Sequence, residues 1–380
     1  MKPRAPKKIL AIKIRALGDT VLMTAPVAEL RRAFPDAEIH VAADSRWAPI
    51  LENHPAIDRI WKFERHRERF ARTKAAAHLA FRLREQHFDC VINFHASPSS
   101  AMISRATGSP LRSIHFHGHL DKNKFSTVDI PGKGSLKPII ERDMDAVRAL
   151  GIEIPAGKLP QLVLDSSEVY QAAARTQRDL LLPDPILGIS LGASRPTKSW
   201  RVVHFAHLAV EWCLKESGSV FATAGPDESR IVRLFNDAVD AELARMIPDS
   251  TTRTSVRNRI TADHSLSVRQ LAALFSRFAV LAGNDSGPKH IAVAVNTPTV
   301  TLFGPEDPFE WHPYEKKKHP FFFVDKLDCR RDALPGMPPW CGVLECTEDH
   351  KCMNLIGVEQ VLTECRRVAR RSPGVKLEPE

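Results

Sequence analysis

The sequence predicts an α/β protein built from two doubly wound, Rossmann-like domains that face a central cleft. Apolar runs typical of buried strands alternate with helical patterns in the first half, and the alternation restarts near residue 185. Each half opens with a strand, a glycine-containing loop and a helix. The 380 residues, 43% of them hydrophobic and 26% charged, have a globular composition that excludes disorder throughout the chain. At about 150 residues per domain, this length suggests two domains.

In the first half, the apolar runs that predict parallel strands lie at residues 9–12, 38–43, 57–63 and 90–94. Apolar residues at helical spacing predict a helix at 21–34 that ends before Pro35. A basic helix is predicted at about 71–86. This order of elements is the βαβ pattern of a parallel sheet.

In the second half, the predicted strands lie at residues 185–191, 219–223, 278–282 and 298–303. A helix is predicted at 202–216, and a polar, proline-containing linker between about 155 and 185. We therefore expect an N-terminal acceptor-side domain at 1–170, a C-terminal nucleotide-binding domain at 171–355, and a helix with a frayed tail at 356–380. Ligands of such folds bind at the carboxyl ends of the strands.

The excess of basic residues, 54 Lys and Arg against 45 Asp and Glu, favours anionic partners such as nucleotides, phosphorylated glycolipid, an anionic leaflet or nucleic acid. Seven cysteines are too sparse for a disulfide scaffold and predict reduced thiols in a cytoplasm. The basic start imitates a signal peptide, but Lys13 interrupts the apolar run after it. No apolar stretch reaches about 18 residues, so a cytoplasmic protein without a membrane-spanning helix is expected.

The strongest chemical signal is the segment 282–292, AGNDSGPKHIA, where a strand ends and a helix begins with Pro288 in its first turn. The N–H groups of a helix N-terminus suit a phosphate. Asp285 can accept hydrogen bonds from sugar hydroxyls, while Ser286 and His290 can donate to phosphate oxygens. A capped turn without a ligand is equally consistent with this spacing.

A second segment, GASRPTKSW at 192–200, follows the first strand of the second half. It places Ser194, Arg195 and Lys198 at a strand edge, where they suit a diphosphate. Taken alone, a solvated basic loop is the simpler interpretation.

A third segment, RALGDT at 15–20, follows the first strand of the chain. Asp19 at this edge could accept a proton from an acceptor hydroxyl. The alternative role for a lone aspartate here is a helix N-cap.

Three weaker signals favour ordinary surface roles. Asp143 and Asp145 match a metal-binding Asp-x-Asp pattern, but their amphipathic helix predicts a solvated face. Four cysteines near the C-terminus lack paired C-x-x-C spacing, so we expect reduced thiols rather than a metal site: Cys329, Cys341, Cys346 and Cys352. The basic run from Arg65 to Lys74 predicts a solvated face, with an anionic membrane as the alternative.

Together the three loops resemble glycosyltransferase family 9, the ADP-heptose:lipopolysaccharide heptosyltransferases. The resemblance extends from about residue 8 to residue 362 and is strongest over 283–308. It implies a GT-B fold with the acceptor on the N-terminal domain and the donor on the C-terminal domain. It also implies an inverting transfer from ADP-heptose that needs no metal and no cofactor.

The resemblance assigns roles residue by residue. Asp19 matches the catalytic base, Lys198 the lysine near the donor phosphates, and Asp285 the residue that holds the donor sugar. The other matched positions contact the phosphates or the nucleoside: Ser194, Ser286, Gly287 and His290 for the phosphates, Glu228 and His264 for the nucleoside. Lys289 departs from the family pattern, in which an apolar or small residue is common, and this predicts an added phosphate contact or an altered donor choice.

The expected partners are an ADP-sugar, a phosphorylated glycolipid and the anionic inner leaflet, with no nucleic acid. Two alternatives keep this fold: another nucleotide-sugar donor, or a binding protein of the envelope pathway without catalysis. A Rossmann oxidoreductase is disfavoured because no G-x-G-x-x-G follows a strand.

Overall fold

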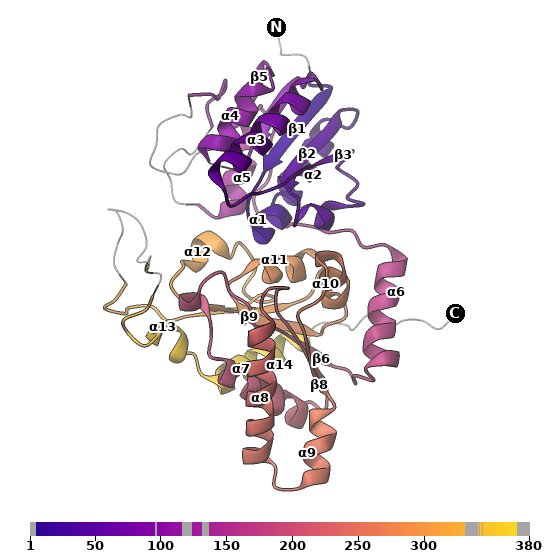
Figure 1. Cartoon of the computed structure of the whole chain (residues 1–380), viewed down its shortest axis with the longest axis vertical. Helices are drawn as coiled ribbons and strands as arrows, with labels where there is room; N and C mark the ends of the chain where they lie inside the picture. The colour runs from indigo at the N-terminus through magenta and orange to yellow at the C-terminus, as the bar shows by residue number, and fades with distance from the viewer. Residues whose placement is uncertain are drawn as a thin grey trace. The chain divides into compact units, whose positions relative to one another are not determined.

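The computed structural model of the chain describes residues 5–95, 97–115, 124–130, 137–330, 341, 343 and 345–370. The chain divides into two compact units, Met1–Val163 and Leu164–Glu380 (Figure 1). Both are α/β units with a parallel sheet. The predicted frayed tail lies outside the described residues. No described helix has the length and apolar character that a membrane crossing requires.

The first unit contains a five-stranded parallel sheet in the order β3-β2-β1-β4-β5. Its strands are β1 (Lys8–Lys13), β2 (Glu38–Asp44), β3 (Arg59–Phe63), β4 (Cys90–Asn93) and β5 (Leu111–Ile114). In β1, Ile9 to Ile12 are fully buried, as expected for a strand covered on both faces. Because β1 pairs with β2 on one side and β4 on the other, its carboxyl end is the switch point of the sheet.

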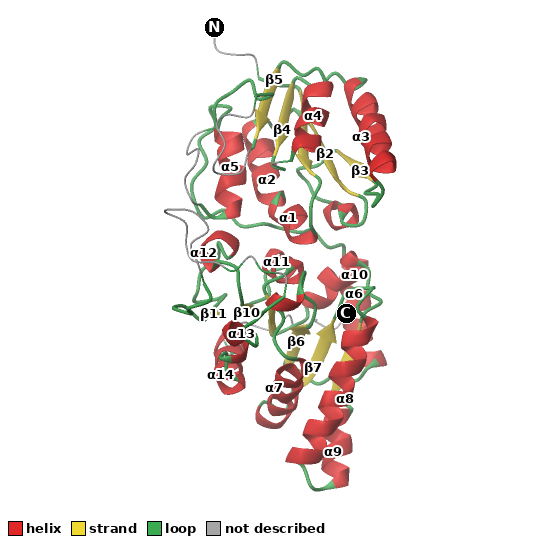
Figure 2. Cartoon of the chain, turned by 60° about the vertical axis from the view of Figure 1, so that its left-hand side comes forward, coloured by secondary structure: helices red, strands yellow, loops and turns green. Residues whose placement is uncertain are grey.

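Helices cover both faces of this sheet. They are α1 (Leu17–Leu22), α2 (Thr24–Ala33), α3 (Arg69–Arg84), α4 (Pro98–Ala106) and α5 (Ile139–Arg148), with a short 3₁₀ turn η1 (Ala48–Leu51). Figure 2 shows α3 and α4 on one face and α2 and α5 on the other. The predicted single helix at 21–34 is wrong, because the chain forms α1 and then α2. Pro26 lacks the N–H that would continue the first helix past Leu22.

The second unit contains a six-stranded parallel sheet in the order β11-β10-β9-β6-β7-β8. Its strands are β6 (Ile186–Ser190), β7 (Ser219–Thr223), β8 (Ile260–Asp263), β9 (Val280–Asn284), β10 (Thr299–Phe303) and β11 (Phe321–Phe323). The switch point lies between β6 and β9, where Ser190 pairs with Gly283. A side chain at Gly283 would place its Cβ only 2.8 Å from Ser190 Cβ, so glycine permits this close approach.

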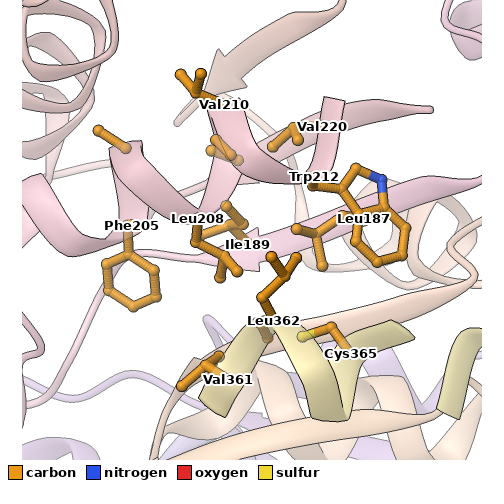
Figure 3. Close-up of a cluster of buried hydrophobic side chains, with 14 of the residues drawn as sticks. Leu187, Ile189, Phe205, Leu208, Val210, Trp212, Val220, Val361, Leu362 and Cys365 are labelled. Carbon is orange, nitrogen blue, oxygen red and sulfur yellow. The ribbon is translucent and has the colours of Figure 1, made fainter. Parts of the chain in front are cut away.

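In the second unit, α6 and η2 precede the first strand, and the other helices and short helical turns lie between or after the strands. These elements are α6 (Ser166–Ala174), η2 (Arg175–Asp179), η3 (Pro196–Lys198), α7 (Val202–Lys215), α8 (Ser229–Met246), α9 (Ser250–Arg257), α10 (Val268–Phe275), α11 (Gly287–Ala294), α12 (Pro308–Trp311), α13 (Lys351–Asn354) and α14 (Val358–Ala369). Figure 3 shows Leu362 and Cys365 of α14 packed with Leu187 of β6 and Trp212 of α7. The C-terminal helix is therefore part of the core of this unit.

The predicted linker at 155–185 is interrupted by α6. Asp165 caps this helix by accepting a hydrogen bond from the Glu168 N–H at 2.9 Å, and the Glu168 side chain completes a capping box. Ala172 and Ala173 are buried, and α6 packs against α10. The boundary between the two units, after Val163, falls within the predicted linker. The linker is shorter than predicted, because the polar sequence conceals the short buried stripe of α6.

Candidate active site

Asp19 lies in the first turn of α1, directly after the carboxyl end of β1. Only 5% of the residue is exposed, and its buried Oδ1 has no hydrogen-bond partner among the described residues. Lys13 Nζ lies 3.7 Å from Oδ1, and Arg15 Nε lies 3.7 Å from Oδ2. The N-cap of α1 is Ala16, so the capping alternative for Asp19 is excluded. Asp19 is thus a carboxylate held beside two cations, and its Oδ1 accepts no hydrogen bond from the described residues.

Lys13 carries a second, closer anion. Its ammonium group donates to both oxygens of Asp143 on α5, at 2.6 Å and 2.9 Å. Both residues are fully buried, so the prediction of a solvated face for Asp143 is wrong. Asp145 is also buried and pairs with Lys137 and Arg148. A buried ammonium requires an anionic partner, and α5 supplies it from a distant part of the sequence.

The charges in this cluster depend on burial. Desolvation raises the pKa of Asp143 to about 6, although the charge of Lys13 opposes this shift. His95 directly follows β4 and was not identified from the sequence. Burial, and to a smaller extent the charges of Arg15 and Lys13, lower its pKa to about 4. We therefore expect a neutral imidazole near Asp19 at pH 7.

In the second unit, Asp285 follows β9 and precedes α11, with 4% of its surface exposed. Lys198 Nζ, on the short turn η3 after β6, lies 2.6 Å from Asp285 Oδ2. Lys289 binds the other oxygen. Burial by itself would raise the pKa of Asp285, but the charges of Lys289 and Lys198 hold that pKa far below its usual range. The structure thus brings together two residues that the sequence analysis took from separate segments.

Asn284 explains how the two segments meet. Its side-chain oxygen accepts a hydrogen bond from Trp200 N at 2.8 Å, and its amide nitrogen donates to Leu191 O at 3.0 Å. Because Leu191 and Trp200 flank the 192–199 loop, this one buried side chain ties the ends of the loop to β9. Sequence reasoning missed Asn284, since nothing in the local pattern separates it from its neighbours in the segment 282–292.

The predicted phosphate-contacting residues of α11 lie in different environments. Ser286 is the N-cap residue and Gly287 the first helical residue, so both lie at the helix N-terminus. His290 is buried and its Nδ1 is hydrogen-bonded to the Tyr314 hydroxyl. Burial, with the nearby charge of Lys289, keeps the pKa of His290 well below its usual range. The ring is therefore directed into the protein through Nδ1, and a phosphate contact would have to use its other nitrogen.

Three remaining donor-side residues lie on loops after β6, β7 and β8. Ser194 is exposed on the loop that carries Lys198. Glu228 accepts a hydrogen bond from Gly225 N at 2.6 Å, and a Cβ at Gly192 would collide with its carboxylate, so Glu228 lies against the loop after β6. His264 directly follows β8 and is half-buried. Adjacent parallel strands place all three at the same edge of the sheet.

The four C-terminal cysteines line one cavity of about 590 Å³, together with the buried Arg330. Cys346 Sγ accepts hydrogen bonds from the N–H groups of Glu348 and His350 at 3.4 Å and 3.2 Å. Over the residues that the structure describes, no three cysteine, histidine or carboxylate side chains converge as metal ligands would.

Two doubly wound parallel sheets, each with a switch point at the carboxyl ends of its strands, define a Rossmann-like α/β protein. A model of glycosyltransferase family 9 (heptosyltransferase) matches residues 76–331, which span both units. The chain therefore belongs to glycosyltransferase family 9 and is a glycosyltransferase.

Curated relatives agree with this assignment. The chain is 24% identical over 322 residues to lipopolysaccharide heptosyltransferase 3 of Escherichia coli, covering 82% of this chain and 88% of that protein. It is 27% identical over 311 residues to lipopolysaccharide heptosyltransferase 2 of E. coli K12, covering 79% and 84%.

Solved structures establish the fold. E. coli ADP-heptose lipopolysaccharide heptosyltransferase II aligns with a TM-score of 0.71 at 21% identity, over 96% of this chain and 99% of that chain. A family 9 glycosyltransferase from Veillonella parvula aligns with a TM-score of 0.73 at 19% identity, over 96% and 98%. The expected GT-B fold is confirmed.

Proposed function

We propose that this protein is an inverting, metal-independent heptosyltransferase that transfers heptose from ADP-heptose to an acceptor in the lipopolysaccharide inner core. The observation that carries the proposal is the buried Lys198–Asp285 pair beside the N-terminus of α11. It combines a cation for a diphosphate with a carboxylate for sugar hydroxyls at the switch point of the second sheet. The names of the relatives supply the heptose and the lipopolysaccharide core in this proposal.

On the donor side, Lys198, Ser194 and the N–H groups at Gly287 would offset the negative charge of the diphosphate. That charge grows as the bond from the anomeric carbon to the phosphate oxygen breaks, so these groups stabilise the transition state more than the ground state. Asp285 would accept hydrogen bonds from the sugar, while Glu228 and His264 would contact the nucleoside. The positive charge comes from the protein itself, which is why we propose transfer without a metal ion.

On the acceptor side, Asp19 would act as the general base. The acceptor hydroxyl attacks the anomeric carbon from the face opposite ADP and loses its proton to Asp19 as the new glycosidic bond forms. ADP leaves with the electron pair of the broken bond, so the anomeric configuration inverts. The Oδ1 of Asp19 supports this role, because it is buried and accepts no hydrogen bond from the described residues. The mechanism requires the first unit to present Asp19 to a donor held by the second.

For the acceptor we propose a phosphorylated glycolipid at the anionic inner leaflet. Helix α3 supports this part of the proposal, because its sequence RFARTKAAAHLAFRLR contains basic residues and no acidic residue. Phe70 and Phe81 are 83% and 64% exposed. Eleven residues apart, they lie on one line of the helix, and the exposed cation Lys74 lies one turn from Phe70 on the same face. Apolar rings beside basic groups are typical of a surface that binds an anionic membrane.

The donor is tested by calorimetry against a panel of nucleotide sugars, followed by a transfer assay with each binder. We expect ADP-heptose to bind and to be consumed only when acceptor is present. Tight binding of a different nucleotide sugar would favour the alternative donor. Binding of ADP-heptose without any transfer to inner-core acceptors would favour the non-catalytic binding protein.

A further inference from the structure

The Asp285 carboxylate has two ammonium partners, one on each oxygen. Lys198 reaches it from η3, and Lys289 from the first turn of α11. All three side chains are largely removed from solvent, with 11% of the Lys198 side chain, 4% of Lys289 and 5% of Asp285 exposed. The cluster therefore contains one more cation than is needed to neutralise Asp285.

Groups of the protein already surround the Lys289 ammonium in the described structure. Its ammonium donates to Asp285 and, at 2.9 Å, to the carbonyl oxygen of Trp311 in α12. Its remaining side faces the ring of Phe303, whose centroid lies 4.4 Å away. The expected phosphate contact of Lys289 is thus not supported by this geometry, and its function must be exerted through Asp285.

Lys198 is in the opposite situation. It is the more exposed of the two lysines, it lies on a three-residue turn, and Asp285 is the anion it pairs with in the described structure. A diphosphate bound at α11 would attract this ammonium away from Asp285. Removing the last counter-ion of a buried carboxylate is strongly unfavourable, so a second cation that stays on Asp285 makes the exchange possible.

We propose that Lys289 is a positioning residue that keeps Asp285 paired while Lys198 turns from Asp285 to the donor diphosphate. This inference rests on the proposed function, in which Lys198 binds the diphosphate. The proposal also explains physically why this chain has a lysine at position 289, where an apolar or small residue is common in the family. Lys289 does not touch the donor, but it sets the free energy at which Lys198 becomes available.

The charge of Lys289 depends on pH. Burial lowers its pKa to about 8, although Asp285 opposes the shift. The other titratable groups facing this cluster are Glu306, His290, His312 and Tyr314, and burial keeps the pKa of Tyr314 well above its usual value. Burial keeps the pKa values of both histidines low, so neither titrates near pH 8. The proposed benefit is therefore present below pH 8 and lost as the pH rises above it.

The test is a double-mutant cycle on ADP binding, measured by calorimetry at pH 7 with wild type, Lys289→Met, Asp285→Asn and the double variant. We expect Lys289→Met alone to weaken ADP binding by about tenfold or more. In the Asp285→Asn background there is no buried carboxylate to leave unpaired, so Lys289→Met should change affinity by less than about threefold. Equal losses in both backgrounds, or no loss in either, would overturn the proposal.

Two further measurements distinguish the proposed positioning role of Lys289 from a purely structural role. They also test that role independently of the proposed ADP donor. The arginine of the Lys289→Arg variant keeps its positive charge at high pH. The ADP affinity of this variant should therefore stay constant from pH 7 to 9.5, while the ADP affinity of the wild type falls. Parallel pH profiles of the two affinities would contradict the proposal. Lys215→Met is the matched control, because Lys215 pairs with Glu211 on α7 instead. If wild type fails to bind ADP, the ADP donor is wrong, and the same cycle run with inorganic diphosphate still decides the role of Lys289.

Discussion

Lys13 and Asp143 form a fully buried ion pair, with Nζ 2.6 Å from Oδ2, and the same ammonium lies 3.7 Å from Asp19. One cation is thus shared unequally between two carboxylates. Because Asp143 takes the shorter contacts, Asp19 Oδ1 receives no hydrogen bond from any residue that the structure describes. The unequal sharing leaves the proposed base available to an acceptor hydroxyl.

Asp19→Asn should abolish transfer while leaving ADP-sugar affinity nearly unchanged. The amide retains the shape of the side chain but cannot take a proton, and loss of a general base costs about 10²–10⁴ in rate. Transfer rates and calorimetric affinities of the variant test this directly. A variant that turns over at the wild-type rate would show that the base has been misassigned.

Asp143→Asn should change how stability depends on pH. Burial raises the pKa of Asp143 from the ordinary 3.8 to about 6, so the folded chain binds its proton more tightly than the unfolded chain does. That contribution is complete below about pH 4 and is lost as the pH rises through about 6. Urea unfolding of both proteins from pH 3.5 to 7 should therefore show the wild type losing stability relative to the variant. Parallel pH profiles would contradict this.

Lys198→Ala should weaken both donor binding and the transfer rate, each by about tenfold or more, because a charge-assisted contact to the leaving diphosphate is removed. Steady-state kinetics with varied donor concentration would measure both effects. Arg201→Ala, which removes an exposed arginine paired with Asp349 just beyond the same loop, is the matched control and should leave both parameters unchanged. Wild-type kinetics for Lys198→Ala would remove this lysine from the phosphate site.

Chelation should not affect the reaction. Protein cations and the α11 N-terminus offset the charge of the leaving group in the proposed mechanism, so activity is expected to persist in excess EDTA. The measurement is the initial transfer rate before and after chelation. Complete loss of activity that a divalent ion restores would overturn the metal-independent mechanism.

Replacing Phe70 and Phe81 together with serine should reduce binding to vesicles that contain anionic lipid. Two exposed aromatic rings are removed from the basic helix α3, while its charges remain. Vesicle co-sedimentation of the variant and of wild type gives the comparison, with Leu234→Ser on α8 as a control that removes a 46% exposed apolar side chain elsewhere. Undiminished binding of the double variant would exclude α3 as the contact surface.

Much of the fold was predictable because its information is local. The buried strands β1, β6, β9 and β10 are mostly apolar runs, and a glycine follows within a few residues of the ends of β1, β6 and β9, which located the carboxyl ends of these strands. The short strands β5, β8 and β11 were missed, because β5 and β8 mix polar with apolar residues and β11 has only three residues, whereas the equally short β4 belongs to a longer, mostly apolar run. The helix α6 was missed because only one narrow side of it is apolar.

The candidate site divides in the same way. Asp19, Lys198 and Asp285 were identifiable from the sequence by itself, because each stands in a short segment whose order of residues is distinctive. Their partners were not identifiable: Asp143 is 130 residues from Lys13, and Trp311 is 22 residues from Lys289. Whether a charged side chain lies in water or in the interior depends on which distant elements cover it. Only the tertiary structure decides that, and burial then determines which charges must be paired.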